Sequence, residues 1–269
     1  MPRWKLADRE LVSDKPLVMG ILNLTPDSFS DGGRFAVPEQ AVAAALAMQA
    51  DGADILDIGG QSTRPGHTPL SAEEEWARLV PVLPTLVRQL KLPLSIDTYH
   101  PTVAERATAL GVAIINDVSG SLQNGMTAVA AASGAGLVMT CPEAACVADV
   151  AAYFRAALDR AEADGMDRRQ VCLDVGIGFG KTRELDRELI VQLPLLRREF
   201  AEQCLLVGAS RKRVIAAFGG DAPPDKRLGG TLAAHTLAQL GGADVLRVHD
   251  VLETVQAVTL TAAFSERSK

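Results

Sequence analysis

The chain has 269 residues, of which 48% are hydrophobic and 22% charged, and its formal net charge is −6. This length allows one large α/β barrel or two ordinary domains, and the composition allows a sizeable buried core. The acidic balance argues against a general nucleic-acid binder, because proteins that neutralise phosphates usually carry a basic surplus. Any anion site must therefore be local.

Cysteine usage indicates a reducing compartment, and the hydropathy of the chain indicates neither a signal peptide nor a membrane span. The cysteines have neither CxxC spacing nor the density of a disulfide framework, so we expect four structural thiols. Residues 1–14 are mixed and charged, and a run of about 18 apolar residues, the length of a membrane span, occurs nowhere. We therefore expect a cytoplasmic protein with no membrane partner. The cysteines are Cys141, Cys146, Cys172 and Cys204.

Eight short apolar runs, rich in β-branched residues, follow one another along the chain. Each is largely free of charge, which is typical of parallel strands covered on both faces. The runs are residues 17–22, 54–58, 92–96, 113–115, 136–139, 171–173, 204–207 and 245–248.

Longer helical patterns separate these runs. Ser71 is a predicted N-cap because acidic residues follow it in the first turn, and Gly52 follows the helix before the second strand. The expected helices include residues 38–51, 72–90, 101–110, 147–163, 188–200 and 230–240.

Eight alternating strand and helix units favour a single closed (β/α)8 TIM barrel over residues 1–269. No internal linker or low-complexity stretch divides the chain, and no sequence repeat suggests a solenoid. The alternative is a doubly wound open sheet, which at this size would usually show a domain boundary or an edge strand.

In (β/α)8 enzymes the active site is built at the carboxyl ends of the strands. Seven of the eight predicted strands end in polar or glycine-rich clusters, and a single such cluster would ordinarily be a turn or a helix cap. Cations and carboxylates at the same rim instead indicate a pocket with opposed subsites. The clusters are residues 23–33, 59–66, 97–98, 116–117, 174–181, 208–212 and 247–250.

One group of these residues supplies hydrogen-bond acceptors. Asp97, Asn116 and Asp174 follow the third, fourth and sixth strands, so their side chains should converge near the barrel axis. Two carboxylates and an amide suit a flat heterocycle with several N–H donors, such as an aminopyrimidinone. The alternative is that they are caps and braces. Asn116 and Asp117 also compete for the inward position.

The second group is cationic, and it follows strands two, seven and eight, where phosphate sites recur in this fold. Ser210 could also begin a helix near Arg211 and offer its amino-terminal N–H groups to an anion. Arg211 and Arg213 are expected to face solvent. The candidate ligands of a phosphate or diphosphate are Arg64, Lys212, Arg247 and His249.

Two phosphate-binding motifs and a zinc site are disfavoured. The P-loop pattern GxxxxGK[ST] requires glycine at position 175, where this chain has Val175, and the glycines at 176, 178 and 180 do not form GxGxxG. The histidines, His67, His100, His235 and His249, lack the spacing of a zinc site. A Mg²⁺ ion shared between a diphosphate and one protein oxygen remains compatible, with Asn23 as the candidate ligand.

Seven motifs together resemble those of the dihydropteroate synthase family, in the same order and across almost the whole chain. The first two and the last two are the most specific. The motifs are NLTPDSFSDGG (23–33), GGQSTRPG (59–66), SIDT (95–98), INDVSG (115–120), DVGIGFGKT (174–182), SRK (210–212) and RVHDV (247–251).

The resemblance implies a folate-pathway transferase that joins 4-aminobenzoate to 6-hydroxymethyl-7,8-dihydropterin diphosphate and releases pyrophosphate. It implies a homodimer, and loops 25–35 and 62–67 that close over the substrates. By motif match, the pterin would be held by Asp97, Asn116, Asp174, Lys212 and Met139, and 4-aminobenzoate by Thr63, Arg64, Pro65 and Ser210. Asn23, Arg64, Arg247 and His249 would hold the diphosphate, with Asn23 as ligand of Mg²⁺, and Lys212, Arg247, His249 and Arg64 would be catalytic.

Three departures from the family pattern keep alternatives open. The family usually has glutamate at Gln61 and proline at Val175, and the stretch after the fifth strand, 139–146, is short here. A non-catalytic pterin-binding paralogue is one alternative. A methyltransferase that uses methyltetrahydrofolate and a corrinoid partner is the other, but such an enzyme should not need the SRK and RVHD motifs.

Overall fold

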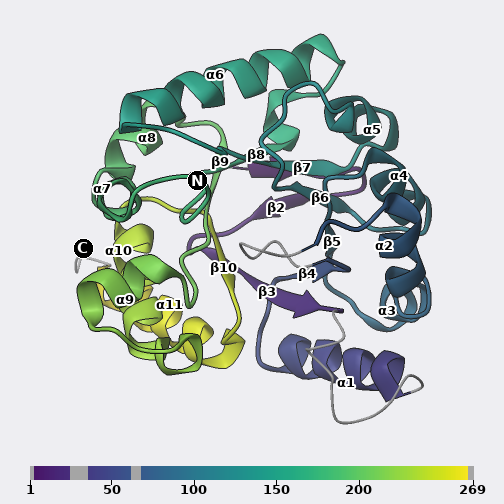
Figure 1. Cartoon of the computed structure of the whole chain (residues 1–269), viewed down its shortest axis with the longest axis horizontal. Helices are drawn as coiled ribbons and strands as arrows, with labels where there is room; N and C mark the ends of the chain where they lie inside the picture. The colour runs from purple at the N-terminus through teal and green to yellow at the C-terminus, as the bar shows by residue number, and fades with distance from the viewer. Residues whose placement is uncertain (1–2, 25–35, 62–67, 266–269) are drawn as a thin grey trace.

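The computed structural model describes residues 3–24, 36–61 and 68–265 and contains a closed barrel of eight parallel strands inside a ring of helices (Figure 1). The predicted fold is confirmed, and all eight predicted strands are present. The last strand closes the barrel by pairing with the first, with Val245 opposite Leu17. In chain order the barrel strands are β3 Leu17–Asn23, β4 Ile55–Gly59, β5 Leu94–Asp97, β6 Ile114–Asp117, β7 Gly136–Thr140, β8 Val171–Asp174, β9 Cys204–Val207 and β10 Val245–Val248.

The helices lie outside the strands and cover their outward faces (Figure 1). The helices are α1 Ala36–Ala50, α2 Ala72–Leu79, α3 Leu83–Gln89, α4 Pro101–Ala109, α5 Met126–Ser133, α6 Val147–Ala163, α7 Arg183–Val191, α8 Leu193–Glu199, α9 Arg213–Gly219, α10 Leu228–Leu240 and α11 Val251–Ser265, with 3₁₀ turns at Arg168–Gln170 and Pro224–Lys226. Within the described residues, none of these helices has both the length and the apolarity needed to cross a membrane.

Two predicted helices are each split in two. The predicted helix 72–90 is α2 and α3, and the predicted helix 188–200 begins earlier and is α7 and α8. Proline stands in the first turn of each second segment, at Pro84 and Pro194. Proline has no N–H to donate and its ring collides with the preceding turn, so a helix restarts there instead of continuing.

A short antiparallel hairpin precedes the barrel and fills its amino-terminal end. Its strands are β1 Arg3–Lys5 and β2 Glu10–Val12. Trp4 is 1% exposed, and its indole N–H donates to the carbonyl oxygen of Gln170 at 2.9 Å. A Cβ at Gly136 would lie 2.5 Å from the Leu6 side chain, so only glycine fits beneath this plug.

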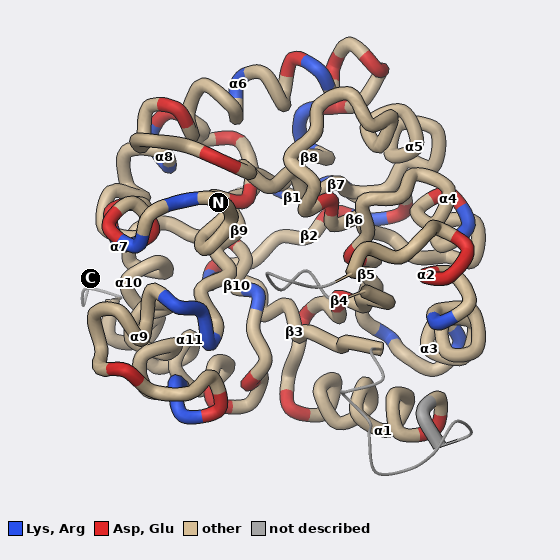
Figure 2. Tube along the Cα trace, viewed as in Figure 1, with Lys and Arg blue, Asp and Glu red and all other residues tan. Residues whose placement is uncertain are grey.

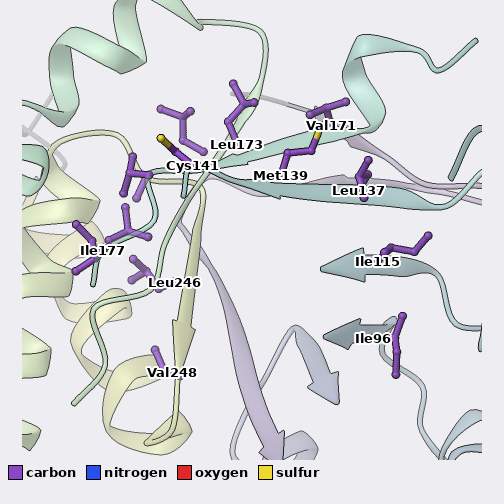
Figure 3. Close-up of a cluster of buried hydrophobic side chains, with 14 of the residues drawn as sticks. Ile96, Ile115, Leu137, Met139, Cys141, Val171, Leu173, Ile177, Leu246 and Val248 are labelled. Carbon is purple, nitrogen blue, oxygen red and sulfur yellow. The ribbon is translucent and has the colours of Figure 1, made fainter. Parts of the chain in front are cut away.

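Alternation along the strands separates an inner layer from an outer one. The outer side chains, such as Leu137, Leu173 and Val248, belong to the large cluster that packs under the helices (Figure 3). The apolar inner layer meets Trp4 and Leu6 and contains Met19, Ile55, Ile114, Val138, Cys172, Cys204, Leu206 and Val245. Side chains two residues further along a strand share its face. The inner layer is therefore followed, towards the carboxyl ends, by Asp57, Asp97, Asn116, Thr140, Asp174 and Arg247.

Three of the four cysteines are buried free thiols, as expected for structural residues: Cys141, Cys172 and Cys204. Burial raises the pKa of all three, which keeps them protonated. Cys146 differs from the expectation because it is exposed at the residue before α6.

Candidate active site

The carboxyl end of the barrel holds a charged network centred on Asp57. This residue lies within β4 and is 0% exposed. Its Oδ2 accepts from Arg247 Nε at 2.6 Å and from Asn116 Nδ2 at 2.8 Å, and Arg247 Nη2 donates to Asp97 Oδ2 at 2.5 Å. Figure 2 shows acidic and basic positions close together at the ends of the central strands. Three predicted site residues thus meet around an aspartate that the sequence analysis missed.

The competition between Asn116 and Asp117 is resolved by their partners. Asn116 is 2% exposed and its amide reaches inward to Asp57. Asp117 accepts from the Ser119 N–H at 2.9 Å and from Asn124 Nδ2 at 2.8 Å. Asn116 is therefore the inward residue, and Asp117 braces the loop after β6.

Burial sets the electrostatics of the network. Burial raises the pKa of Asp97; Arg247 opposes this shift, and the charges of Asp57 and Glu75 add to it. Burial also opposes the charge of Arg247, but Asp57 and Asp97 outweigh it and raise the pKa of the guanidinium. Arg247 is thus permanently charged and compensates two carboxylates that water reaches poorly.

Asp174, the third predicted acceptor, is held from two sides. Its Oδ1 accepts from the Gly176 N–H at 2.9 Å, and its Oδ2 accepts from the Thr140 hydroxyl at 3.2 Å. Thr140 ends β7 on its inner face and is a second residue that the sequence analysis missed. The carboxylate is 5% exposed and its orientation is fixed before any ligand arrives.

Lys212 reaches the same end of the barrel. A Cβ at Gly208 would lie 3.9 Å from Lys212 Nζ, an ordinary van der Waals distance, so the ammonium lies beside this strand end. Nζ donates to the Ile177 carbonyl at 2.5 Å and lies 4.7 Å from the centre of the Phe179 ring. Burial lowers the pKa of Lys212 to about 8, although Asp174 opposes the shift.

The SRK and RVHD segments contact each other through Ser210 and His249. Ser210 Oγ lies 3.0 Å from His249 Nδ1 and accepts from the His249 backbone N–H at 3.2 Å. Ser210 does not begin a helix as expected, since α9 starts at Arg213 with Lys212 as its N-cap. The expectation for Arg211 was also wrong: it is partly buried and its guanidinium pairs with Asp250, whereas Arg213 is exposed as expected.

Met139 does not reach the pocket. It alternates with Val138 and Thr140 on β7, so its side chain belongs to the outer layer, where it is 3% exposed under the helices (Figure 3). The motif match assigned it to the pterin because spacing alone does not show which face of a strand is inward. The inward position at this height is Thr140.

The remaining site predictions lie outside the described residues. These are Thr63, Arg64 and Pro65, together with the loops 25–35 and 62–67. The departure at Gln61 has a local role, because its Oε1 accepts from the Leu70 N–H at 2.5 Å. Val175 is 0% exposed and packs in the outer cluster.

A divalent cation fits this site only as a partner of a bound anion. Asn23 ends β3, and its Oδ1 lies 3.5 Å from where a Cβ on Gly59 would be. Across residues 3–24, 36–61 and 68–265, no three His, Cys, Asp or Glu side chains could share a metal. One amide oxygen is compatible with Mg²⁺, which keeps waters and takes phosphate oxygens as ligands.

Comparison with known proteins agrees with this geometry. A family model described as pterin binding enzyme matches residues 19–249. Dihydropteroate synthase of Synechocystis sp. is 41% identical over 247 residues, which cover 87% of this chain and 85% of that protein. A solved structure of Xanthomonas albilineans dihydropteroate synthase with 4-aminobenzoic acid has a TM-score of 0.93 and 43% identity, over 99% of both chains. A Yersinia pestis dihydropteroate synthase in a sulfonamide drug complex has a TM-score of 0.88 and 34% identity, over 97% of this chain and 98% of that chain.

The family match begins in the first barrel strand and ends just beyond the last, so the barrel and its polar carboxyl end define a pterin-binding enzyme. Identity of about two residues in five extends over nearly the full length of the relatives as well. The chain belongs to the dihydropteroate synthase family.

Proposed function

We propose that this protein condenses 6-hydroxymethyl-7,8-dihydropterin diphosphate with 4-aminobenzoate to form 7,8-dihydropteroate and pyrophosphate. The observation that supports this most is the meeting of Asp97, Asn116 and Arg247 in one network at the carboxyl end of the barrel. The solved Xanthomonas albilineans relatives contain 4-aminobenzoic acid in one case and 7,8-dihydropteroate in another.

The acidic side of the site suits the pterin. Asp97, Asn116 and Asp174 offer oxygen acceptors to the N–H groups of the ring, and Lys212 offers a donor to a ring oxygen or nitrogen. All three acceptors are at most 7% exposed, so water competes weakly for these bonds. In this proposal the heterocycle lies across the barrel axis above Asp57.

The cationic side suits the departing diphosphate. A guanidinium has five N–H donors, so Arg247 can hold Asp57 and Asp97 and still donate to a phosphate oxygen. The bond between the pterin methylene and the diphosphate oxygen breaks first, and the electron pair leaves with pyrophosphate. Asp97 and Asp174 offset the positive charge left on the ring, and the amine of 4-aminobenzoate attacks the methylene and loses a proton. Charge arranged in advance is the main catalytic contribution.

Mg²⁺ is part of the proposal, with Asn23 as its protein ligand. When bound, the ion would neutralise charge on the diphosphate. His249 and Arg64 complete the proposed anion site, and Thr63, Arg64, Pro65 and Ser210 the proposed 4-aminobenzoate site.

The wider proposal is a single-domain cytoplasmic homodimer without nucleic-acid or membrane partners. Large apolar side chains stand exposed on α10 and α11, which suits a subunit contact. They are Leu237, Leu240, Leu252, Leu260 and Phe264. Sedimentation of the protein at micromolar concentration tests this, because a mass of one chain would contradict the dimer.

A direct assay tests the proposed reaction. The protein is incubated with dihydropterin diphosphate, 4-aminobenzoate and Mg²⁺, and release of pyrophosphate is followed together with formation of dihydropteroate. Pyrophosphate release that requires all three components is expected. Tight pterin binding without release would instead identify a non-catalytic paralogue, the alternative suggested by the short segment 139–146.

Sulfonamides are expected to inhibit in competition with 4-aminobenzoate. They resemble it in shape and charge, and the sulfonamide complex of the Yersinia pestis relative supports this expectation. Initial rates at several concentrations of both compounds measure the effect. Inhibition that persists unchanged at saturating 4-aminobenzoate would contradict the proposed subsite.

The rate is expected to show a bell-shaped dependence on pH. On the acid side, kcat/KM for the pterin substrate falls as Asp97 is protonated, at a pH above the ordinary range of aspartate because burial raises its pKa. On the alkaline side it falls near pH 8 as Lys212 loses its proton, because burial lowers that pKa.

Lys212→Arg separates the two limbs. Arginine keeps its charge throughout this range, so the variant should lose the decline near pH 8 while it keeps the acid limb. An unchanged alkaline limb in this variant would show that another group titrates there.

A further inference from the structure

Lys181 belongs to the DVGIGFGKT motif, yet none of the pterin or phosphate roles proposed above uses it. Its side chain is 6% exposed. Its ammonium donates to four backbone carbonyl oxygens: those of Cys141 at 2.7 Å, Pro142 at 3.2 Å, Gly176 at 3.1 Å and Phe179 at 3.2 Å. Three N–H groups thus serve four acceptors from two separate loops.

The two loops that Lys181 joins are in close contact. One is the short segment after β7, and the other is the turn 175–181 after β8. A Cβ at Gly176, where φ is 68°, would lie 2.1 Å from the Cys141 carbonyl oxygen and 2.9 Å from Lys181 Nζ. A Cβ at Gly180 would lie 2.5 Å from Glu143 Cγ. The backbones therefore touch, and the lysine is the polar link between them.

The turn held by Lys181 is also the one that contacts the pterin side of the site. The Gly176 N–H donates to Asp174 Oδ1 at 2.9 Å, while the Gly176 carbonyl accepts from Lys181. The Ile177 carbonyl accepts from Lys212, and the Phe179 ring lies under the same ammonium. A shift of this turn would therefore move the partners of both Asp174 and Lys212.

We propose that Lys181 is a positioning residue for the pterin half of the site: it fixes the turn 175–181 against the loop after β7 and so aligns Asp174 and Lys212. This inference rests on the proposed function. It also explains a glycine-rich segment ending in lysine that is not a P-loop, because backbone carbonyls occupy the ammonium that would otherwise meet phosphate.

Two substitutions of graded chemistry test the proposal. Lys181→Met keeps the length of the side chain and removes every donor, whereas Lys181→Gln keeps two donors. Lys181→Met frees the turn that partners Asp174 and Lys212, so its affinity for dihydropterin diphosphate should fall at least about tenfold. Lys181→Gln should lie between Lys181→Met and the wild type. Lys226→Met, at an exposed lysine in the turn Pro224–Lys226, is the matched control and should bind as the wild type does.

The measurements are the Kd of dihydropterin diphosphate by calorimetry, Tm, and hydrogen exchange of the peptides that contain residues 175–181. Weaker binding with faster exchange in this turn is the expected result, and Lys181→Gln supplies it if Lys181→Met does not fold. A lower Tm with wild-type Kd and wild-type exchange would overturn the proposal and leave Lys181 with a stabilising role only. If the wild type itself neither binds the diphosphate nor releases pyrophosphate, the proposed function fails, while exchange in the turn still tests the link.

Discussion

Arg247→Ala is expected to lower kcat by roughly 10²–10³-fold, the usual effect of removing one preorganised hydrogen-bond donor that stabilises charge in the transition state. It should also destabilise the fold by about 3–5 kcal/mol, because loss of one partner leaves buried charge uncompensated. Asp57 is 0% exposed and Asp97 7%, and both accept hydrogen bonds from this guanidinium. Steady-state kinetics and denaturant unfolding at pH 7 measure the two effects.

Two controls separate charge from geometry at this position. Arg247→Lys keeps a cation between the two carboxylates but cannot contact both in the same way, so it should recover more stability than turnover. Arg213→Ala removes an exposed arginine from α9 and should change neither. Wild-type turnover in Arg247→Ala would defeat the assignment of the anion site. Wild-type stability would show that Asp57 and Asp97 are not left as uncompensated buried charges when Arg247 is removed.

Lys212→Met is expected to reduce turnover by about 10²-fold or more, since it also removes a charged hydrogen-bond donor. Its stability, however, should change in the opposite direction to that of Arg247→Ala. Burial lowers the pKa of Lys212 in the folded protein to about 8, below its ordinary value of 10.5, so folding disfavours its proton. The destabilising effect of the charge is fully present below about pH 8 and fades as pH rises towards 10.5. At pH 7 the variant should therefore be at least as stable as the wild type.

Thermal unfolding at pH 7 and pH 10 checks the sign. The advantage of Lys212→Met over the wild type should shrink at the higher pH, where the wild-type lysine is neutral in the folded protein. A variant that is less stable at pH 7 would show that the bonds of Lys212 to the turn 175–181 outweigh its burial. Full activity in this variant would remove Lys212 from the proposed pterin site.

The alternation of apolar runs and helical patterns in the sequence predicted the barrel well, because each strand is a short apolar run and its end is marked by polar residues. They also predicted which side chains gather at one end, since all parallel strands of a barrel finish there. Asp97, Asn116 and Arg247 meet for this reason. The sequence pattern did not show which face of β7 points inward at Met139. The inward residue there is its neighbour Thr140.

Asp57 was not predicted as a site residue because it does not follow a strand. It lies inside β4, whose five residues are all buried. A signal was present: a carboxylate in an otherwise apolar buried strand requires a partner of opposite charge. That partner is 190 positions away, and the closure of the barrel between β10 and β3 carries Arg247 across to it. The pattern of neighbouring residues in the sequence cannot predict a pairing over this distance.

The hairpin at residues 3–12 limits where substrates can enter and leave the barrel. Trp4 and Leu6 close the amino-terminal end of the barrel, opposite the charged network. Because the apolar inner layer fills the barrel between this plug and the charged network, in the proposed reaction 4-aminobenzoate enters and pyrophosphate leaves at the carboxyl end, where the pterin is bound. Because the substrates and pyrophosphate share this opening, the order of substrate binding and product release would be part of the catalytic cycle.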